Sequence, residues 1–147
     1  MAYSSHDYGP YVYWQKYFNA TNYPNNMPAI WDKNWGYLFK QNQFPVWVGE
    51  WGGFYAASNS KIDEVEDLWL EKLTAYIRTN QLSHTWFNWG PDSKDTGGIL
   101  LDDWKSVDMK KMGLLQQIMH PGYGPSSGQT FKKQRKNVGT YRRARRH

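Results

Sequence analysis

Glu50 is the carboxylate whose place in the sequence best suits catalysis. It follows a compact apolar segment, residues 44–49, and glycines stand at positions 49, 52 and 53. Glycine allows a tight turn and the close approach of a ligand. In α/β folds, catalytic groups lie at the carboxyl ends of apolar strands. This segment therefore indicates either a catalytic carboxylate or a loop glutamate that caps nearby backbone, and alone it does not distinguish the two.

A histidine and a tyrosine stand two positions apart near the start of the chain, at His6 and Tyr8. On a strand this spacing points both side chains to the same side. An imidazole and a phenol at a strand's end can hydrogen-bond a carboxylate and hold its orientation. A structural histidine is the more common explanation of such a pair when it is taken alone.

An aromatic segment at 85–89 runs into a loop rich in glycine and aspartate at 91–98. Phe87 and Trp89 share parity, so a strand through both would turn their rings to one side. Aromatic rings stack on the faces of sugars, and this segment is therefore a candidate carbohydrate contact. The alternative is core packing of these rings, which we expect at least for Trp86.

The composition excludes several classes of site. The chain has 147 residues, 18% of them aromatic, and no cysteine, which excludes a disulfide scaffold, a thiolate metal site and a cysteine nucleophile. The motifs of zinc proteases, serine hydrolases and phosphate-binding loops do not occur. We therefore predict no metal and no cofactor. The apolar runs are too short to span a bilayer, and the first residues lack the pattern of a signal peptide.

Charge divides the chain into two parts. Residues 1–120 hold 10 Lys and Arg against 13 Asp and Glu, whereas residues 121–147 hold 8 Lys and Arg and no acid. This pattern indicates a mildly acidic globular domain at 1–120 and a basic, low-complexity tail at 121–147. We expect the tail to be disordered. Its clusters are compatible with phosphate contacts in a nucleic acid, or with a solvated extension that has no dedicated role.

Hydrophobic patterning predicts alternating strands and helices. We expect strands at 2–8, 44–49 and 84–89, the second of them fully buried. We expect helices at 28–41, at about 60–80 with a capping box at Ser60 and Asp63, and at 106–119. This order predicts an α/β fold with parallel strands. Three such units are too few to close an eight-stranded barrel, which needs ~250 residues, so they form a small open sheet or the last part of a larger fold.

Taken together, the motifs resemble cellulases of glycoside hydrolase family 5, and the resemblance covers residues 2–119. It is carried by four separated segments that occur in the family's order: YSSHDYG at 3–9, PNNMPAIW at 24–31, PVWVGEWG at 45–52 and PDSKDTGGILLDDW at 91–104. The resemblance implies a (β/α)8 TIM barrel, of which these residues supply strands six to eight. It also implies retaining hydrolysis of β-1,4-glycosidic bonds in cellulose or related β-glucans, and an extracellular location.

The resemblance assigns roles to individual residues. Glu50 matches the catalytic nucleophile, and His6 and Tyr8 match the pair that hydrogen-bonds around the nucleophile and the sugar. An aromatic ring at the end of strand eight stacks under the sugar. Relatives carry a tryptophan four residues before the proline, where this chain has Phe87, while Trp89 stands two residues before Pro91. Both rings remain candidates for substrate binding.

One departure concerns the general acid. The family's acid/base is a glutamate in an Asn-Glu-Pro motif, and this motif does not occur in the 147 residues. The sequence therefore predicts that this chain alone is inactive and requires an amino-terminal half-barrel as its partner. The alternative is a non-catalytic carbohydrate-binding remnant whose basic tail binds nucleic acid.

Overall fold

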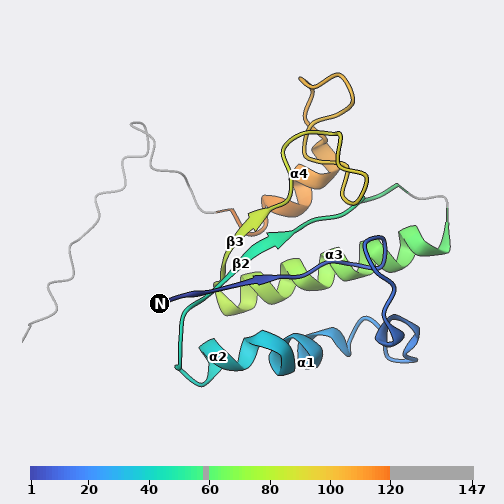
Figure 1. Ribbon diagram of the computed structural model, residues 1–147. Helices are drawn as coiled ribbons and strands as arrows, with labels where there is room; N and C mark the ends of the chain where they lie inside the picture. Colours follow the sequence, from blue (N-terminus) through green and yellow to red (C-terminus); the bar gives the residue numbers. More distant parts are fainter. Residues whose placement is uncertain (58–59, 120–147) are drawn as a thin grey trace, which may run out of the picture.

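The computed structural model describes residues 1–57 and 60–119, and the predicted basic tail at 121–147 lies outside them. Strands and helices alternate along the chain, as the sequence predicts (Figure 1). The elements are β1 (Tyr3–His6), the 3₁₀ helix η1 (Lys16–Asn19), α1 (Met27–Trp31), the π-helix η2 (Asp32–Gly36), α2 (Tyr37–Lys40), β2 (Val46–Trp51), α3 (Lys61–Asn80), β3 (Ser83–Trp86) and α4 (Met109–Leu115).

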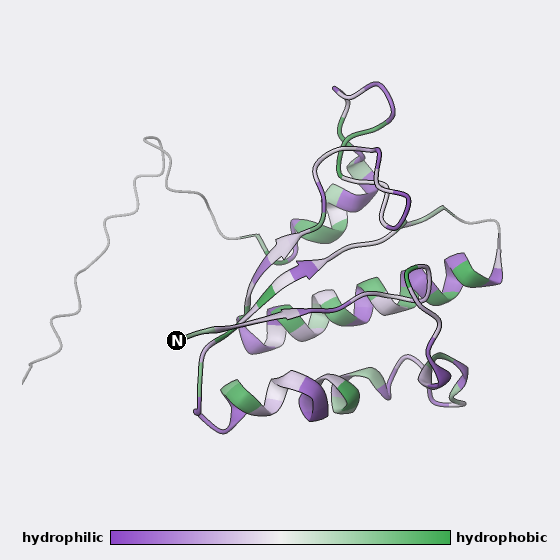
Figure 2. Cartoon of the chain, in the orientation of Figure 1, coloured by the Kyte–Doolittle hydropathy of each residue, from purple (hydrophilic) through white to green (hydrophobic). Residues whose placement is uncertain are grey.

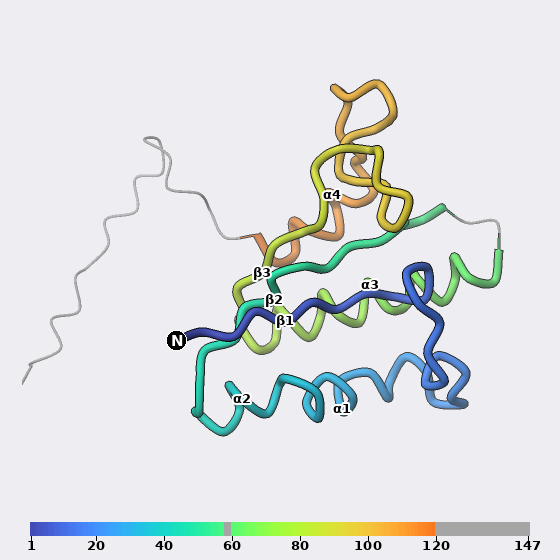
Figure 3. The backbone as a smooth tube through the Cα atoms, viewed as in Figure 1, coloured from blue at the N-terminus to red at the C-terminus, as the bar shows by residue number. Residues whose placement is uncertain are grey.

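The three strands form one parallel sheet in the order β1-β2-β3, which confirms the predicted parallel arrangement. Figure 3 shows the strands side by side, with their connections running through helices. Because the strands are parallel, their carboxyl ends lie at the same edge of the sheet. The loops that follow the three strands therefore gather at that edge, where α/β folds place their functional groups.

Only one face of the central strand is covered. Val46 and Val48 are buried beneath the helices, whereas the Trp47 side chain between them is 43% exposed. The expectation of a fully buried strand is therefore wrong, because the two faces of β2 have different environments. A run of apolar residues does not distinguish a strand covered on both faces from one whose open face carries an aromatic ring.

A bulge at Gly49 changes the direction of the side chains at the end of β2. Ser5 pairs with Val48, but the next residue of β1, His6, pairs with Glu50, so Gly49 is the extra residue. Strict alternation would put Glu50 on the covered face together with Val48. A bulge re-aims the side chains that follow it. Here it brings Glu50 into register with His6.

Helix α3 covers the sheet and forms much of the core. The Ser60 side chain accepts a hydrogen bond from the Asp63 backbone N–H, which confirms the predicted cap. Its buried apolar residues recur at spacings of three and four, and Figure 2 shows the resulting mixture of hydrophobic and hydrophilic bands along the helix. The buried apolar residues of α3 are Val65, Trp69, Leu70, Leu73, Tyr76 and Ile77.

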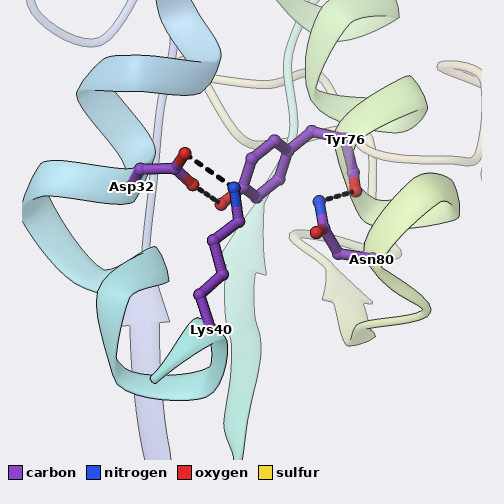
Figure 4. A network of polar contacts seen from close by, with 4 residues as sticks. All are labelled: Asp32, Lys40, Tyr76 and Asn80. Carbon is purple, nitrogen blue, oxygen red and sulfur yellow. Dashed lines mark hydrogen bonds and ion pairs between the residues drawn. The ribbon is translucent and has the colours of Figure 1, made fainter. Parts of the chain in front are cut away.

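The predicted helix at 28–41 is divided into α1, η2 and α2. A polar network at this division joins it to α3 (Figure 4). Lys40 Nζ lies 2.6 Å from Asp32 Oδ2, and the Tyr76 hydroxyl donates to Asp32 Oδ1 at 2.5 Å. A side chain at position 36 would collide with that hydroxyl, so Gly36 allows η2 to approach α3 closely. The spacing of the apolar residues predicts a helical segment here, but it does not predict the π-helical turn η2 within it.

The other bounds also differ from the predicted ones. Strand β1 is shorter than the predicted 2–8. Helix α4 is shorter than the predicted 106–119, because loop residues at both of its ends make their own hydrogen bonds. Strand β3 ends at Trp86, so the parity argument for Phe87 and Trp89 is wrong: neither residue belongs to a strand. No helix in the described part of the chain is long and apolar enough to cross a membrane.

Candidate active site

The carboxyl ends of β1 and β2 bring three predicted site residues together. The Tyr8 hydroxyl donates a hydrogen bond to Glu50 Oε2 at 2.9 Å. His6 Nδ1 lies 3.3 Å from the same oxygen, a contact that becomes an ion pair when the imidazole is protonated. The backbone N–H of Asp7 also donates to the Glu50 carbonyl at 3.0 Å. The carboxylate is thus held from two sides through one oxygen, and its side chain remains partly exposed.

The environment of Tyr8 keeps its hydroxyl protonated. Burial raises the pKa of Tyr8, and the hydrogen bond to the Glu50 carboxylate raises it further. Both effects disfavour a phenolate, since its charge would be partly desolvated and would face another negative charge. Tyr8 is therefore a hydrogen-bond donor to Glu50 across the pH range in which proteins are normally studied.

The ring of Phe87 packs against Tyr8, one member of the group formed by Glu50, His6 and Tyr8. It lies edge-on to the Tyr8 ring, with 6.3 Å between the ring centroids. The Phe87 backbone N–H donates to the Trp51 carbonyl at 2.8 Å, which ties it to the strand that carries Glu50. Trp89 lies in the loop beyond and is 67% exposed. Of the two candidate rings, Phe87 is the one that contacts the group around Glu50.

A second carboxyl next to this group points toward the helices. Trp35 Nε1 donates to Asp7 Oδ2 at 3.0 Å, and the Trp35 ring is buried. Burial raises the pKa of Asp7 to about 6, although the hydrogen bond from Trp35 opposes the shift. Asp7 thus links the end of β1 to the helical layer, on the side opposite to the open face of the sheet.

Glu66 is a buried carboxyl that the sequence analysis missed. It lies on α3, is fully buried, and accepts a hydrogen bond from the Tyr11 backbone N–H at 3.3 Å. A side chain at Gly9 or at Gly53 would collide with its carboxyl group. Glu66 therefore lies directly beneath the loops that follow β1 and β2. In the sequence, Glu66 is marked only by being an acidic residue at a position where the helical pattern predicts an apolar one.

A large cavity among the described residues lies elsewhere. Its volume is about 950 Å³, and it is bounded by the segment after β2 and the loop before α4. Phe54, Tyr55 and Leu100 are among its lining residues, but Glu50, His6 and Tyr8 are not. In the described part of the chain, no group of three acidic or histidine side chains is close enough to hold a metal ion.

The family model for cellulase (glycosyl hydrolase family 5) matches residues 1–93. The chain belongs to glycoside hydrolase family 5. An endoglucanase from Paenibacillus polymyxa is 46% identical over 82% of this chain, and the major extracellular endoglucanase of Xanthomonas campestris is 40% identical over 77% of it. These alignments cover 30% and 22% of the two relatives. The chain therefore spans less than a third of the length of these family members.

Solved structures of family members also match this chain. An endocellulase variant from Pyrococcus horikoshii, in complex with cellotetraose, matches with a TM-score of 0.74 and 36% identity. The catalytic domain of the major endoglucanase from Xanthomonas campestris matches with a TM-score of 0.71 and 39% identity. Each comparison covers at least 80% of this chain and about a third of the other. The three parallel strands are thus part of a family 5 (β/α)8 barrel.

The loop after Glu50 should tolerate no side chain at Gly52. A Cβ there would collide with the backbone carbonyl oxygen of Phe87, which cannot rotate away. We expect Gly52→Ala to lower the free energy of unfolding by about 1–3 kcal/mol and to displace Phe87. Gly113→Ala is the matched control, because nothing lies within 4 Å of its added Cβ in α4. Thermal unfolding of both variants checks this, and equal midpoints would contradict it.

Proposed function

We propose that the protein hydrolyses β-1,4-glycosidic bonds in cellulose or related β-glucans by a retaining mechanism, with Glu50 as the nucleophile. The observation that carries the proposal is the convergence of Tyr8 and His6 on one oxygen of the Glu50 carboxylate, at 2.9 and 3.3 Å. These contacts hold the carboxylate in one orientation. They leave Oε1 as the oxygen that attacks the sugar.

In this mechanism Glu50 Oε1 forms a bond to the anomeric carbon of the sugar while the glycosidic C–O bond breaks. The departing oxygen takes a proton from a second carboxyl group, and a glycosyl ester of Glu50 results. Water, deprotonated by the same second group, then attacks the anomeric carbon and releases Glu50. Two inversions at the anomeric carbon give net retention of configuration.

We propose that the second carboxyl comes from the rest of the barrel. A retaining site needs its two carboxyl groups about 5–5.5 Å apart, and no Asn-Glu-Pro motif occurs in this sequence. In this proposal β1, β2 and β3 are barrel strands six, seven and eight, and an amino-terminal half-barrel supplies the acid. The exposed Trp47 ring on the open face of β2 is compatible with such a partner.

The substrate in this proposal is a β-glucan chain whose reacting sugar lies on Phe87. This ring is favoured over Trp89 because it contacts Tyr8, and Tyr8 contacts Glu50. We also propose that the protein acts outside the cell, since the related Xanthomonas campestris protein bears the name major extracellular endoglucanase. A polymeric substrate such as cellulose requires an enzyme that reaches it there.

Covalent labelling tests the assignment of Glu50. We expect a slow-reacting fluoro-sugar to label Glu50 once the chain is joined to the amino-terminal part of a family relative, because a nucleophile bonds to the sugar and an acid/base does not. Peptide mass spectrometry locates the label. Label on another carboxylate of this chain, or an inverted anomer as first product, would exclude Glu50 from this role.

A further inference from the structure

The loop between β3 and α4 contains a closed turn with an exposed tryptophan. The base of the turn is an antiparallel bridge between Leu100 and Val107. Inside it, the Leu101 N–H donates to the Ser106 carbonyl and the Trp104 N–H donates to the Leu101 carbonyl, both at 2.8 Å. Figures 1 and 3 show this loop rising beyond the carboxyl end of β3, on the same side of the sheet as the carboxyl end of β2.

One carboxylate fixes the backbone around this tryptophan. Asp103 Oδ1 accepts from the backbone N–H groups of Lys105 and Ser106 at 3.0 and 2.7 Å, and its Oδ2 accepts from the Ser106 hydroxyl at 2.5 Å. The turn is thus rigid on both sides of Trp104. A rigid turn presents a side chain in one position without losing conformational entropy when a ligand binds.

Trp104 itself has a costly backbone conformation. Its φ is 59°, in the left-handed region that glycine and asparagine adopt readily and bulky residues rarely do. A structural turn would be more stable with glycine at this position. Strained backbone at a bulky residue is concentrated at functional sites. The tryptophan therefore has a role that the turn alone does not explain.

The indole ring is exposed, and one of its edges lies against Gly90. The side chain is 57% exposed. Two of its ring atoms, Cζ3 and Cη2, lie 3.0 and 3.2 Å from the position that a Cβ on Gly90 would occupy. The missing side chain at Gly90 leaves room for this edge of the ring, so the ring rests on backbone while much of it faces solvent.

We propose that Trp104 is a binding platform for a neutral β-linked glucose chain, on the loop after β3 and outside the group around Glu50. This inference rests on the proposed function, because it takes the same polysaccharide as ligand. The apolar face of an indole matches the C–H face of a pyranose ring. The exposed carboxylate of Asp102 on the same turn suits sugar hydroxyls, whereas a protein partner would have to desolvate it.

Native gel electrophoresis of the full chain in hydroxyethyl cellulose tests the platform. This polymer is uncharged, so the basic residues at 121–147 do not attract it. We expect the wild-type chain to be retarded, and Trp104→Gly to weaken the apparent affinity about five-fold through loss of ring stacking. Tyr37→Ala is the matched control, because it removes an exposed aromatic ring from α2. Trp104→Tyr, which keeps a ring, should retain most of the retardation.

Stability measurements separate a ligand contact from a structural role. Because glycine relieves the backbone conformation at position 104, we expect Trp104→Gly to have a thermal midpoint equal to or above that of the wild type. Trp104→Asn, which also suits this conformation, gives the same comparison with a side chain present. Loss of retardation without loss of stability supports the platform.

Three outcomes would overturn the platform: no retardation of the wild-type chain, equal retardation of Trp104→Gly, or loss of retardation only in variants that are also destabilised. The covalent label at Glu50 is an independent measurement. If Glu50 is labelled and Trp104→Gly binds normally, only the platform is wrong. If Glu50 is not labelled and the Trp104 variants still lose binding, only the proposed hydrolase is wrong.

Discussion

Glu50→Gln is expected to lower kcat by roughly 10⁴ or more when the chain is joined to the amino-terminal part of a family relative. A glutamine amide does not form the glycosyl ester, so the first step of the mechanism is lost. The change is nearly isosteric, and the amide oxygen still accepts the hydrogen bond from Tyr8 at the position of Oε2. The fold should therefore be intact while the reaction stops. Release of reducing ends from carboxymethyl cellulose measures the rate.

Two further variants define this result. Glu64→Gln makes the same chemical change at an exposed position of α3, and it should leave kcat unchanged. Tyr8→Phe removes the hydrogen bond to Glu50 but not the nucleophile, so we expect a smaller loss of about 10–100-fold, as for a bond to a charged group. A Glu50→Gln enzyme with more than a tenth of the wild-type kcat would be incompatible with a nucleophilic role.

The alternation of strands and helices was predictable because it depends on local patterns. The capping box at Ser60 and the apolar spacing of α3 are contained in the sequence itself. His6, Tyr8 and Glu50 were predictable as a set from their motifs, and their proximity follows from parallel strands whose carboxyl ends share one edge. Their convergence on one oxygen was not, since it depends on the register between β1 and β2.

Features that depend on contacts between distant segments were not predictable. The bulge at Gly49 exists only relative to β1. The end of β3 at Trp86 is set by the loop that follows, where backbone groups of Asn88 and Trp89 bond to Ile99 and Leu100 instead of to a strand. Glu66 has the spacing of a core residue but the chemistry of a surface residue, and only the fold reveals that it is buried.

Glu66 predicts a strong dependence of stability on pH. Burial raises the pKa of Glu66 to about 8 from an ordinary value of 4.5, and the nearby carboxylates of Asp67 and Asp63 add to the shift. The hydrogen bond from the Tyr11 N–H and the charge of Lys111 oppose it. Between these two pKa values the folded protein keeps a proton that the unfolded chain releases. Its contribution to stability is therefore complete below pH 4.5 and is lost as the pH rises through about 8.

We expect Glu66→Gln to remove this loss, because an amide has no proton to release. The free energies of unfolding of the variant and the wild type should be similar near pH 5. By pH 9 the variant should be more stable by on the order of 4 kcal/mol, since each pKa unit corresponds to about 1.4 kcal/mol. Asp7, with its pKa raised to about 6, adds a slope of the same sign, but it is common to both proteins and cancels in the difference.

Urea unfolding at pH 5, 7 and 9 measures the difference, and Glu64→Gln should follow the wild-type curve at every pH. If the curves for Glu66→Gln and the wild type run parallel from pH 5 to 9, Glu66 is charged in the folded protein at neutral pH, and the loops after β1 and β2 tolerate a buried carboxylate beneath them.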